Sequence, residues 1–175
     1  MNSIKLSDEC FDEILKISQI YYREAQKCNK TKAFLAGCIM IGAALEAILL
    51  AFANCYVDEG VKAANVPKEK NGKVKPLIKW SLNNLLKVAD ECKWLPRGLL
   101  DDQYWDQAKA QIGDYCEVTR QIRNFVHPAK YASDKPDKRI TKKYLKSLFE
   151  IINVTIDYLL KKIYESIREE IKNEE

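Results

Sequence analysis

The sequence predicts an all-α fold, an up-and-down bundle of four to five long helices. Apolar residues recur at intervals of three and four over several long segments, which is the spacing of one face of an α-helix. Polar segments that contain proline, glycine and lysine separate these apolar segments. Half-buried strands show alternating apolar and polar residues, and no segment of this sequence alternates in this way over a useful length. We therefore expect residues 1–175 to form one helical domain.

Composition places the chain among ordinary globular proteins. Charged residues make up 31% and hydrophobic residues 47% of the 175 residues, enough for a real core. The formal net charge is only +4, so the total charge does not require a broad nucleic-acid-binding surface. Any nucleic-acid site is expected to be local.

The six cysteines indicate a reducing compartment. None belongs to a Cys-x-x-Cys pair, and their spacing matches no zinc or disulfide framework. The first residues carry acidic side chains early and lack the apolar core of a secretory signal. We expect free thiols and a cytoplasmic location.

The first two helices are expected over residues 7–29 and from about residue 31 to residue 57. Ser7 or Asp8 can cap the first helix. Residues 33–57 carry one charge, Glu46, in an almost continuous apolar run, so a transmembrane span has to be weighed against a buried central helix. We favour the buried helix and expect no membrane association, because only one such segment exists and a carboxylate at mid-span is costly in lipid.

Three more helices are expected after the polar connection at residues 58–76. The third covers residues 77–94, where Pro96 and Gly98 follow. The fourth is a long segment that starts after residues 99–102, includes Trp105 and Ala108, and ends at Pro128. The last runs from about residue 138 to residue 173, after a polar turn at residues 133–138.

The run TRQIRNFVHP at residues 119–128 is the most informative motif. At about 100° per residue, Arg120, Arg123, Asn124 and His127 fall within an arc of about 100°. The opposite arc is apolar and should anchor the helix; it holds Tyr115, Val118, Ile122, Phe125 and Val126.

This pattern predicts an anion-binding, proton-handling stripe near a helix end. Pro128 disfavours α conformation at His127, the chain's only histidine, and so places it at that end. The alternative is an ordinary helix C-terminus, where cations complement the helix dipole.

The motif and the expected bundle together resemble the HEPN superfamily, small helical bundles with an arginine, four to six intervening residues and a histidine. Arg120 with six residues before His127 fits this spacing, and Gln121 is the polar neighbour that often follows the arginine. Arg123 and Asn124 match a familiar Arg-Asn pair but stand one residue too close to His127, so they are secondary members. The small-residue run GAALEAILL at residues 42–50 also resembles the second helix of such bundles.

The resemblance implies a metal-independent endoribonuclease, of the kind that acts as a toxin or a defence effector. The alternative that it leaves open is a non-catalytic domain that binds RNA, a nucleotide or a partner protein such as an antitoxin. We expect no cofactor, since no metal-ligand set or glycine-rich phosphate loop is present in the sequence.

A single histidine per chain leaves one catalytic role unfilled, so we expect a homodimer that joins two copies of His127. We also expect Glu46 to be largely buried and paired with Arg120 or Arg123, because an unpaired carboxylate in an apolar helix would be costly.

Overall fold

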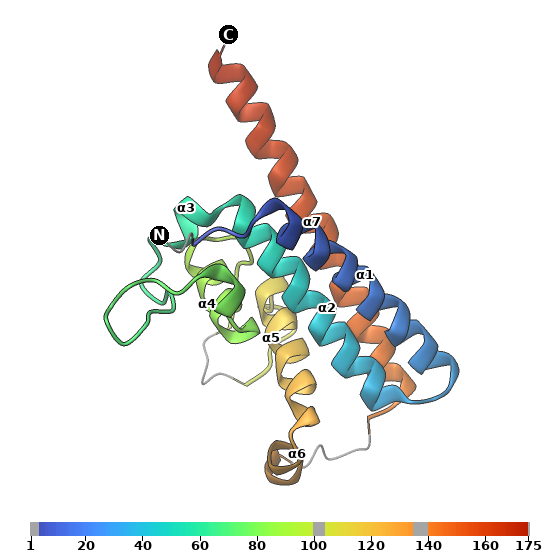
Figure 1. Ribbon diagram of the computed structural model, residues 1–175. Coiled ribbons are helices and arrows are strands. Elements are labelled where there is room, and N and C mark those ends of the chain that lie inside the picture. The colour runs from blue at the N-terminus through green and yellow to red at the C-terminus, as the bar shows by residue number, and fades with distance from the viewer. Residues whose placement is uncertain (1–3, 100–103, 135–139, 175) are drawn as a thin grey trace.

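A computed structural model describes residues 4–99, 104–134 and 140–174, and in these ranges the protein is all-α. Helices account for 71% of the structure, no strand forms within the ranges, and residues Lys68 and Val74 make one isolated bridge. These ranges hold seven α-helices, of which α2 is central, and α1, α4, α5 and α7 pack against it (Figure 1). The expected all-α class is confirmed, whereas the expected number of four to five helices is too low.

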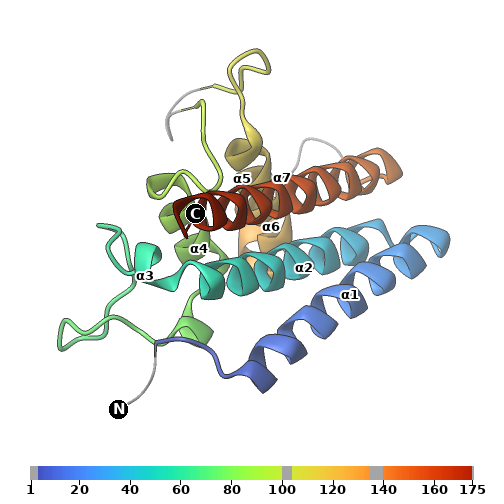
Figure 2. The ribbon, with the colours of Figure 1, turned by 90° about the horizontal axis from the view of Figure 1, so that it is seen from above.

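Helices α1 and α2 form a long antiparallel pair (Figure 2). Helix α1, Asp8–Lys30, begins where the Ser7 hydroxyl accepts a hydrogen bond from the Cys10 N–H group, as expected from its sequence. Helix α2, Phe34–Cys55, is long and apolar enough to cross a membrane. Of its most apolar 18 residues, 56% are buried inside the bundle. The expected buried central helix is therefore confirmed.

The expected third helix, residues 77–94, is two elements. A 3-10 turn, η1 (Leu77–Lys79), precedes α4 (Leu82–Glu91). The chain is extended at Trp80, whose buried indole donates a hydrogen bond to the Lys75 carbonyl. Ser81 then caps α4. The prediction of one continuous helix is wrong because this cap and the anchored indole end one element and start another. A short helix, α3 (Val57–Gly60), follows α2.

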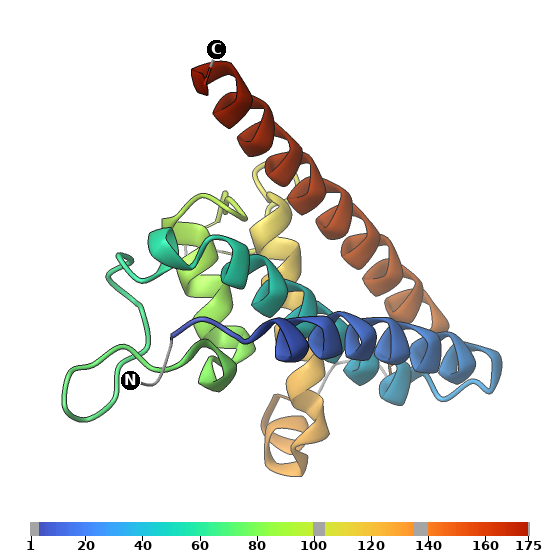
Figure 3. The same cartoon turned by 45° about the horizontal axis from the view of Figure 1, so that its top comes forward.

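The expected fourth helix is shorter than predicted and is followed by further elements. Helix α5 covers Ile112–Arg123, so Trp105 and Ala108 lie before it in non-helical chain, and part of its expected lead-in, residues 100–103, lies outside the described residues. After α5 come the 3-10 turn η2 (Asn124–Val126) and the short helix α6 (Pro128–Asp134), which was not predicted (Figure 3).

The last helix, α7 (Lys142–Glu174), packs its first half on α2 and α5, and its C-terminal end projects beyond the other helices (Figures 1 and 3). It starts later than expected, because Ile140 and Thr141 are not helical; residue 138 lies outside the described residues.

The Cys116 thiol of α5 lies 3.3 Å from the Thr155 hydroxyl of α7, and burial raises the pKa of this thiol to about 12. All six cysteines are free.

Candidate functional site

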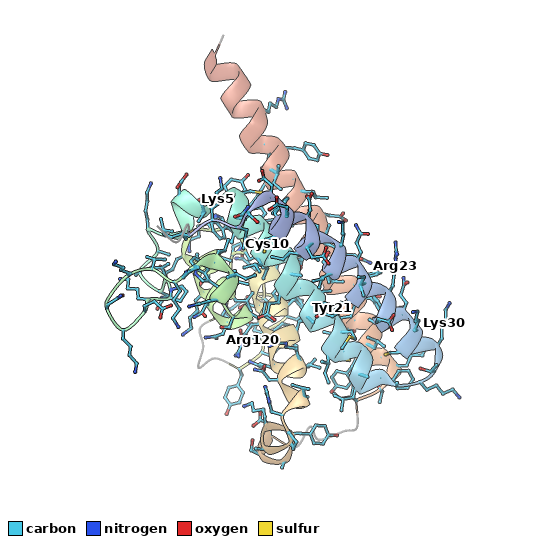
Figure 4. All side chains as sticks on the ribbon, in the orientation of Figure 1. Lys5, Cys10, Tyr21, Arg23, Lys30 and Arg120 are labelled. Carbon is cyan, nitrogen blue, oxygen red and sulfur yellow. The ribbon has the colours of Figure 1, made fainter. Side chains whose placement is uncertain are left out.

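Arg120 lines a polar pocket of about 560 Å³ between α4 and α5. Figure 4 shows Arg120 on α5. Helix α4 lines the pocket with residues such as Asn83, Lys87 and Asp90, and Arg97 comes from the loop between the two helices. Cations and carboxylates therefore share the same solvent-accessible hollow.

The guanidinium of Arg120 is held by the carboxylate of Glu117, one turn earlier on α5. Arg120 donates from Nε to Oε2 at 2.8 Å and from Nη2 to Oε1 at 2.5 Å. The Gln121 amide donates to Oε1 of the same carboxylate at 3.3 Å. Gln121 is exposed and lines the pocket with Arg120, so the structure brings these two predicted residues together. Glu117, which the sequence interpretation did not single out, joins them.

Arg123 has a different partner, Glu46 of α2. Its Nη2 donates to Glu46 Oε2 at 2.7 Å, and the two side chains are 30% and 23% exposed. The other oxygen of Glu46 accepts the N–H group of Leu82 at 2.7 Å, at the first residue of α4. Glu46 thus joins α2, α4 and α5. The expected pairing of Glu46 is confirmed, with Arg123 as the partner, and Glu46 is partly rather than fully buried.

Gly42 makes room for this pair. It lies one turn before Glu46 on α2, and a Cβ atom there would collide with the Cβ and Cγ atoms of Arg123. The aliphatic part of Arg123 therefore crosses α2 where a side chain is missing, and its guanidinium reaches Glu46. This contact gives Arg123 a structural role.

His127 is exposed at the junction between η2 and α6. It is extended, with φ −85° and ψ 115°, and its N–H group donates to the Asn124 carbonyl at 3.0 Å. Its own carbonyl accepts from the Tyr131 N–H group at 3.0 Å, so α6 begins at Pro128. The predicted position of the histidine at a helix end is confirmed.

The expected single stripe is interrupted. Regular α-helix ends at Arg123, and Asn124 is the partly buried residue where the 3-10 turn begins. Arg120 lines the pocket beside α4, Arg123 lies against α2, and among the described residues His127 is not part of the pocket lining. One continuous α-helix through His127 would place these side chains on one stripe, but the α-helix ends at Arg123.

Asp114 is a buried residue that was not predicted from the sequence, and its neighbour Gly113 and its partner Arg97 line the pocket. The Asp114 side chain is 2% exposed and accepts from Arg97 Nε at 3.1 Å and from the N–H groups of Gly98 and Gln111 at 2.7 and 2.8 Å. Burial alone would raise its pKa, but these N–H groups and the Arg97 cation outweigh burial and lower the pKa below its ordinary value. Asp114 is the third residue of α5, a position where a carboxylate caps a helix well, so its capping role could have been predicted from the sequence.

Gly98 and Gly113 allow this arrangement. A Cβ atom on Gly98 would overlap the Lys109 carbonyl, and one on Gly113 would lie 2.6 Å from the Leu95 carbonyl. The loop before α5 therefore lies against the start of that helix, and it brings Arg97 to the pocket.

A second hollow, of about 900 Å³, lies between α5 and α7 and is mostly apolar. Tyr115 and Val118 of the predicted anchoring arc line it, and Tyr115 meets the Trp105 ring edge to face, with centroids 5.1 Å apart. Ile122 of the same arc is buried as expected, but Val126 is 50% exposed. The apolar arc therefore anchors α5 only in part.

The described residues contain no group of three or more histidine, cysteine or acidic side chains that could hold a metal ion. They contain a positioned guanidinium at a polar pocket and an exposed histidine at the junction of η2 and α6. Comparisons with protein-family models, with curated proteins and with solved structures found no match for this chain.

Proposed function

We propose that this protein is a metal-independent endoribonuclease of HEPN type, in which Arg120 and His127 are the catalytic residues. The observation that carries the proposal is the geometry of Arg120. Its guanidinium is held in a solvent-accessible pocket. Arg120 lies on α5, and the 3-10 turn η2 connects this helix to the exposed His127. The contact of Arg123 with Glu46 instead joins α5 to α2, and this structural role supports the Arg120–His127 frame of the motif.

The chemistry requires three groups. A base removes the proton of an RNA 2′-hydroxyl, the 2′-oxygen attacks the adjacent phosphorus, and the bond from phosphorus to the 5′-oxygen breaks as that oxygen takes a proton. A fixed cation stabilises the extra negative charge on the phosphorus oxygens. Arginine suits the last role, and histidine suits the two proton transfers.

One histidine per chain cannot be both base and acid for one substrate at the same moment. We therefore propose a homodimer in which the α6 ends approach a two-fold axis and each copy of His127 serves one transfer. Such a nuclease would act in the cytoplasm as a toxin or defence effector, with an antitoxin as a fitting protein partner.

A second candidate function is a non-catalytic domain that binds RNA, a nucleotide or a protein. The observation in its favour is that both arginines of the motif form ion pairs with carboxylates of the same chain. The modest net charge of +4 counts against RNA cleavage, since processing a polyanion benefits from several basic contacts.

The test is to incubate the purified protein with RNA in EDTA and to identify the new 3′ ends. The proposed reaction leaves 2′,3′-cyclic phosphates, because the 2′-oxygen is the nucleophile. New ends with a 3′-hydroxyl would contradict the mechanism. RNA that stays intact but is bound would favour the second function.

A further inference from the structure

The ion pair between Glu117 and Arg120 differs from the other pairs at this helical spacing. The side chains of Arg120 and Glu117 are 23% and 20% exposed, and they share two hydrogen bonds. The pair of Lys16 with Glu13 is 69% and 62% exposed, and its charged atoms are 3.9 Å apart. An exposed single contact contributes little and leaves both side chains mobile.

Two parallel hydrogen bonds fix a guanidinium in a way that one does not. With both Nε and Nη2 held by one carboxylate, the plane of the group is set, and most rotamers of the long side chain are excluded. Glu117 is itself steadied by the Gln121 amide on the same face of α5. Arg120 is therefore ordered before any ligand arrives.

We propose that Glu117 is a positioning residue, which acts through Arg120 and sets its guanidinium toward an RNA phosphate bound at the α4–α5 pocket. The inference rests on the proposed function and extends it by one residue and one place for the phosphate. Lys87 lines the same pocket as a further cation, together with the carboxylates of Asp90 and Glu91. An oriented cation stabilises a developing charge without reorganisation, whereas a mobile one has to be ordered during the reaction.

The first part of the experiment does not depend on cleavage. Hydrogen exchange at the Nε–H group of Arg120 is followed by proton–nitrogen NMR, with Arg120→Ala to assign the signal. We expect slow exchange in the wild type and exchange at least about tenfold faster in Glu117→Gln, which removes the charge and one of the two acceptors. Asp90→Asn is the matched control, because it removes one carboxylate from the same pocket and should leave this exchange unchanged.

The second part measures RNA cleavage under single-turnover conditions. Glu117→Gln should lower the cleavage rate about tenfold to a hundredfold while RNA affinity changes far less. In an Arg120→Ala background the same substitution should have no further effect, since Glu117 acts through Arg120. An additional loss in that background would overturn the inference.

The outcomes separate the two proposals. Rapid exchange of the Arg120 Nε–H group in the wild type overturns the role of Glu117 even if RNA is cleaved. Slow exchange without any cleavage means that the ribonuclease function fails alone. In that case inorganic phosphate should shift the Arg120 signal in the wild type and not in Glu117→Gln, and equal shifts in both proteins would overturn the positioning role as well.

Discussion

At the scale of single residues, carboxylates decide where the two arginines of the motif lie. Glu46 holds Arg123 against α2, and Glu117 holds Arg120 at the α4–α5 pocket. The sequence predicts that Glu46 pairs with Arg120 or Arg123, because Glu46 is the lone charge in an apolar helix, and the structure identifies Arg123 as the partner. The contact between Glu117 and Arg120 was not predicted, because a glutamate three residues before an arginine is common on exposed helices. The burial of Glu117 depends on the position of α4.

Arg123→Ala should lower the free energy of unfolding by about 1–3 kcal/mol, which urea denaturation measures. A fully buried pair would cost about 3–5 kcal/mol when broken, and the partial exposure of both side chains reduces that value. Arg123→Lys should recover only part of the loss, because lysine cannot reproduce the fork geometry of a guanidinium. An Arg123→Ala protein as stable as the wild type would contradict a structural role for this arginine.

Asp114→Asn should destabilise the protein at neutral pH by about 2–4 kcal/mol, because it removes the negative charge of a carboxylate that accepts hydrogen bonds from three N–H groups. The folded pKa of Asp114 lies below its ordinary value of 3.8, so its stabilisation is present above pH 3.8 and is lost as the pH falls through the folded pKa.

The difference in unfolding free energy between the wild type and Asp114→Asn should therefore shrink below pH 3.8. Chemical denaturation across this range checks the sign. A difference that grows on acidification would show that Asp114 is not charged in the folded protein.

At the scale of elements, the sequence predicts helices better than it predicts their breaks. Apolar spacing correctly located α1 and α2 and the existence of the last helix. The same spacing wrongly predicted continuous helix through Trp80 and through Asn124. Apolar residues continue at helical intervals at both places, but local hydrogen bonds end the helix there. Capping residues were the better signal: Ser81 with Asn84 marks the start of α4, and Asp114 marks the start of α5.

Ser81→Ala should therefore lower stability by about 1 kcal/mol, the usual contribution of a helix cap. The Ser81 hydroxyl accepts from the Asn84 N–H group, and the Asn84 side chain accepts from the Ser81 N–H group. Thermal unfolding of Ser81→Ala and Ser81→Asp measures the effect, and the aspartate variant should stay close to the wild type. Equal losses in both variants would show that the hydroxyl acts in some way other than capping.

At the scale of the whole molecule, the proposed chemistry requires two chains. The mass of one chain is 20.2 kDa, so light scattering at micromolar concentration should report about 40 kDa, twice that value. The apolar hollow between α5 and α7 and the exposed end of α6 are separate surfaces, and only contact near α6 serves the mechanism. A species of 20 kDa at all concentrations would contradict the dimer.

The most direct test of the central claim compares RNA cleavage in EDTA by the wild type, His127→Ala, Arg120→Ala and Arg23→Ala. Arg23 is an exposed arginine on α1, away from α5 (Figure 4), so its loss matches the charge change of Arg120→Ala at an unrelated place. We predict that the wild type and Arg23→Ala cleave RNA alike, whereas the His127 and Arg120 variants, still folded, lose about a hundredfold to ten-thousandfold in rate. Cleavage by His127→Ala at the wild-type rate would contradict the account.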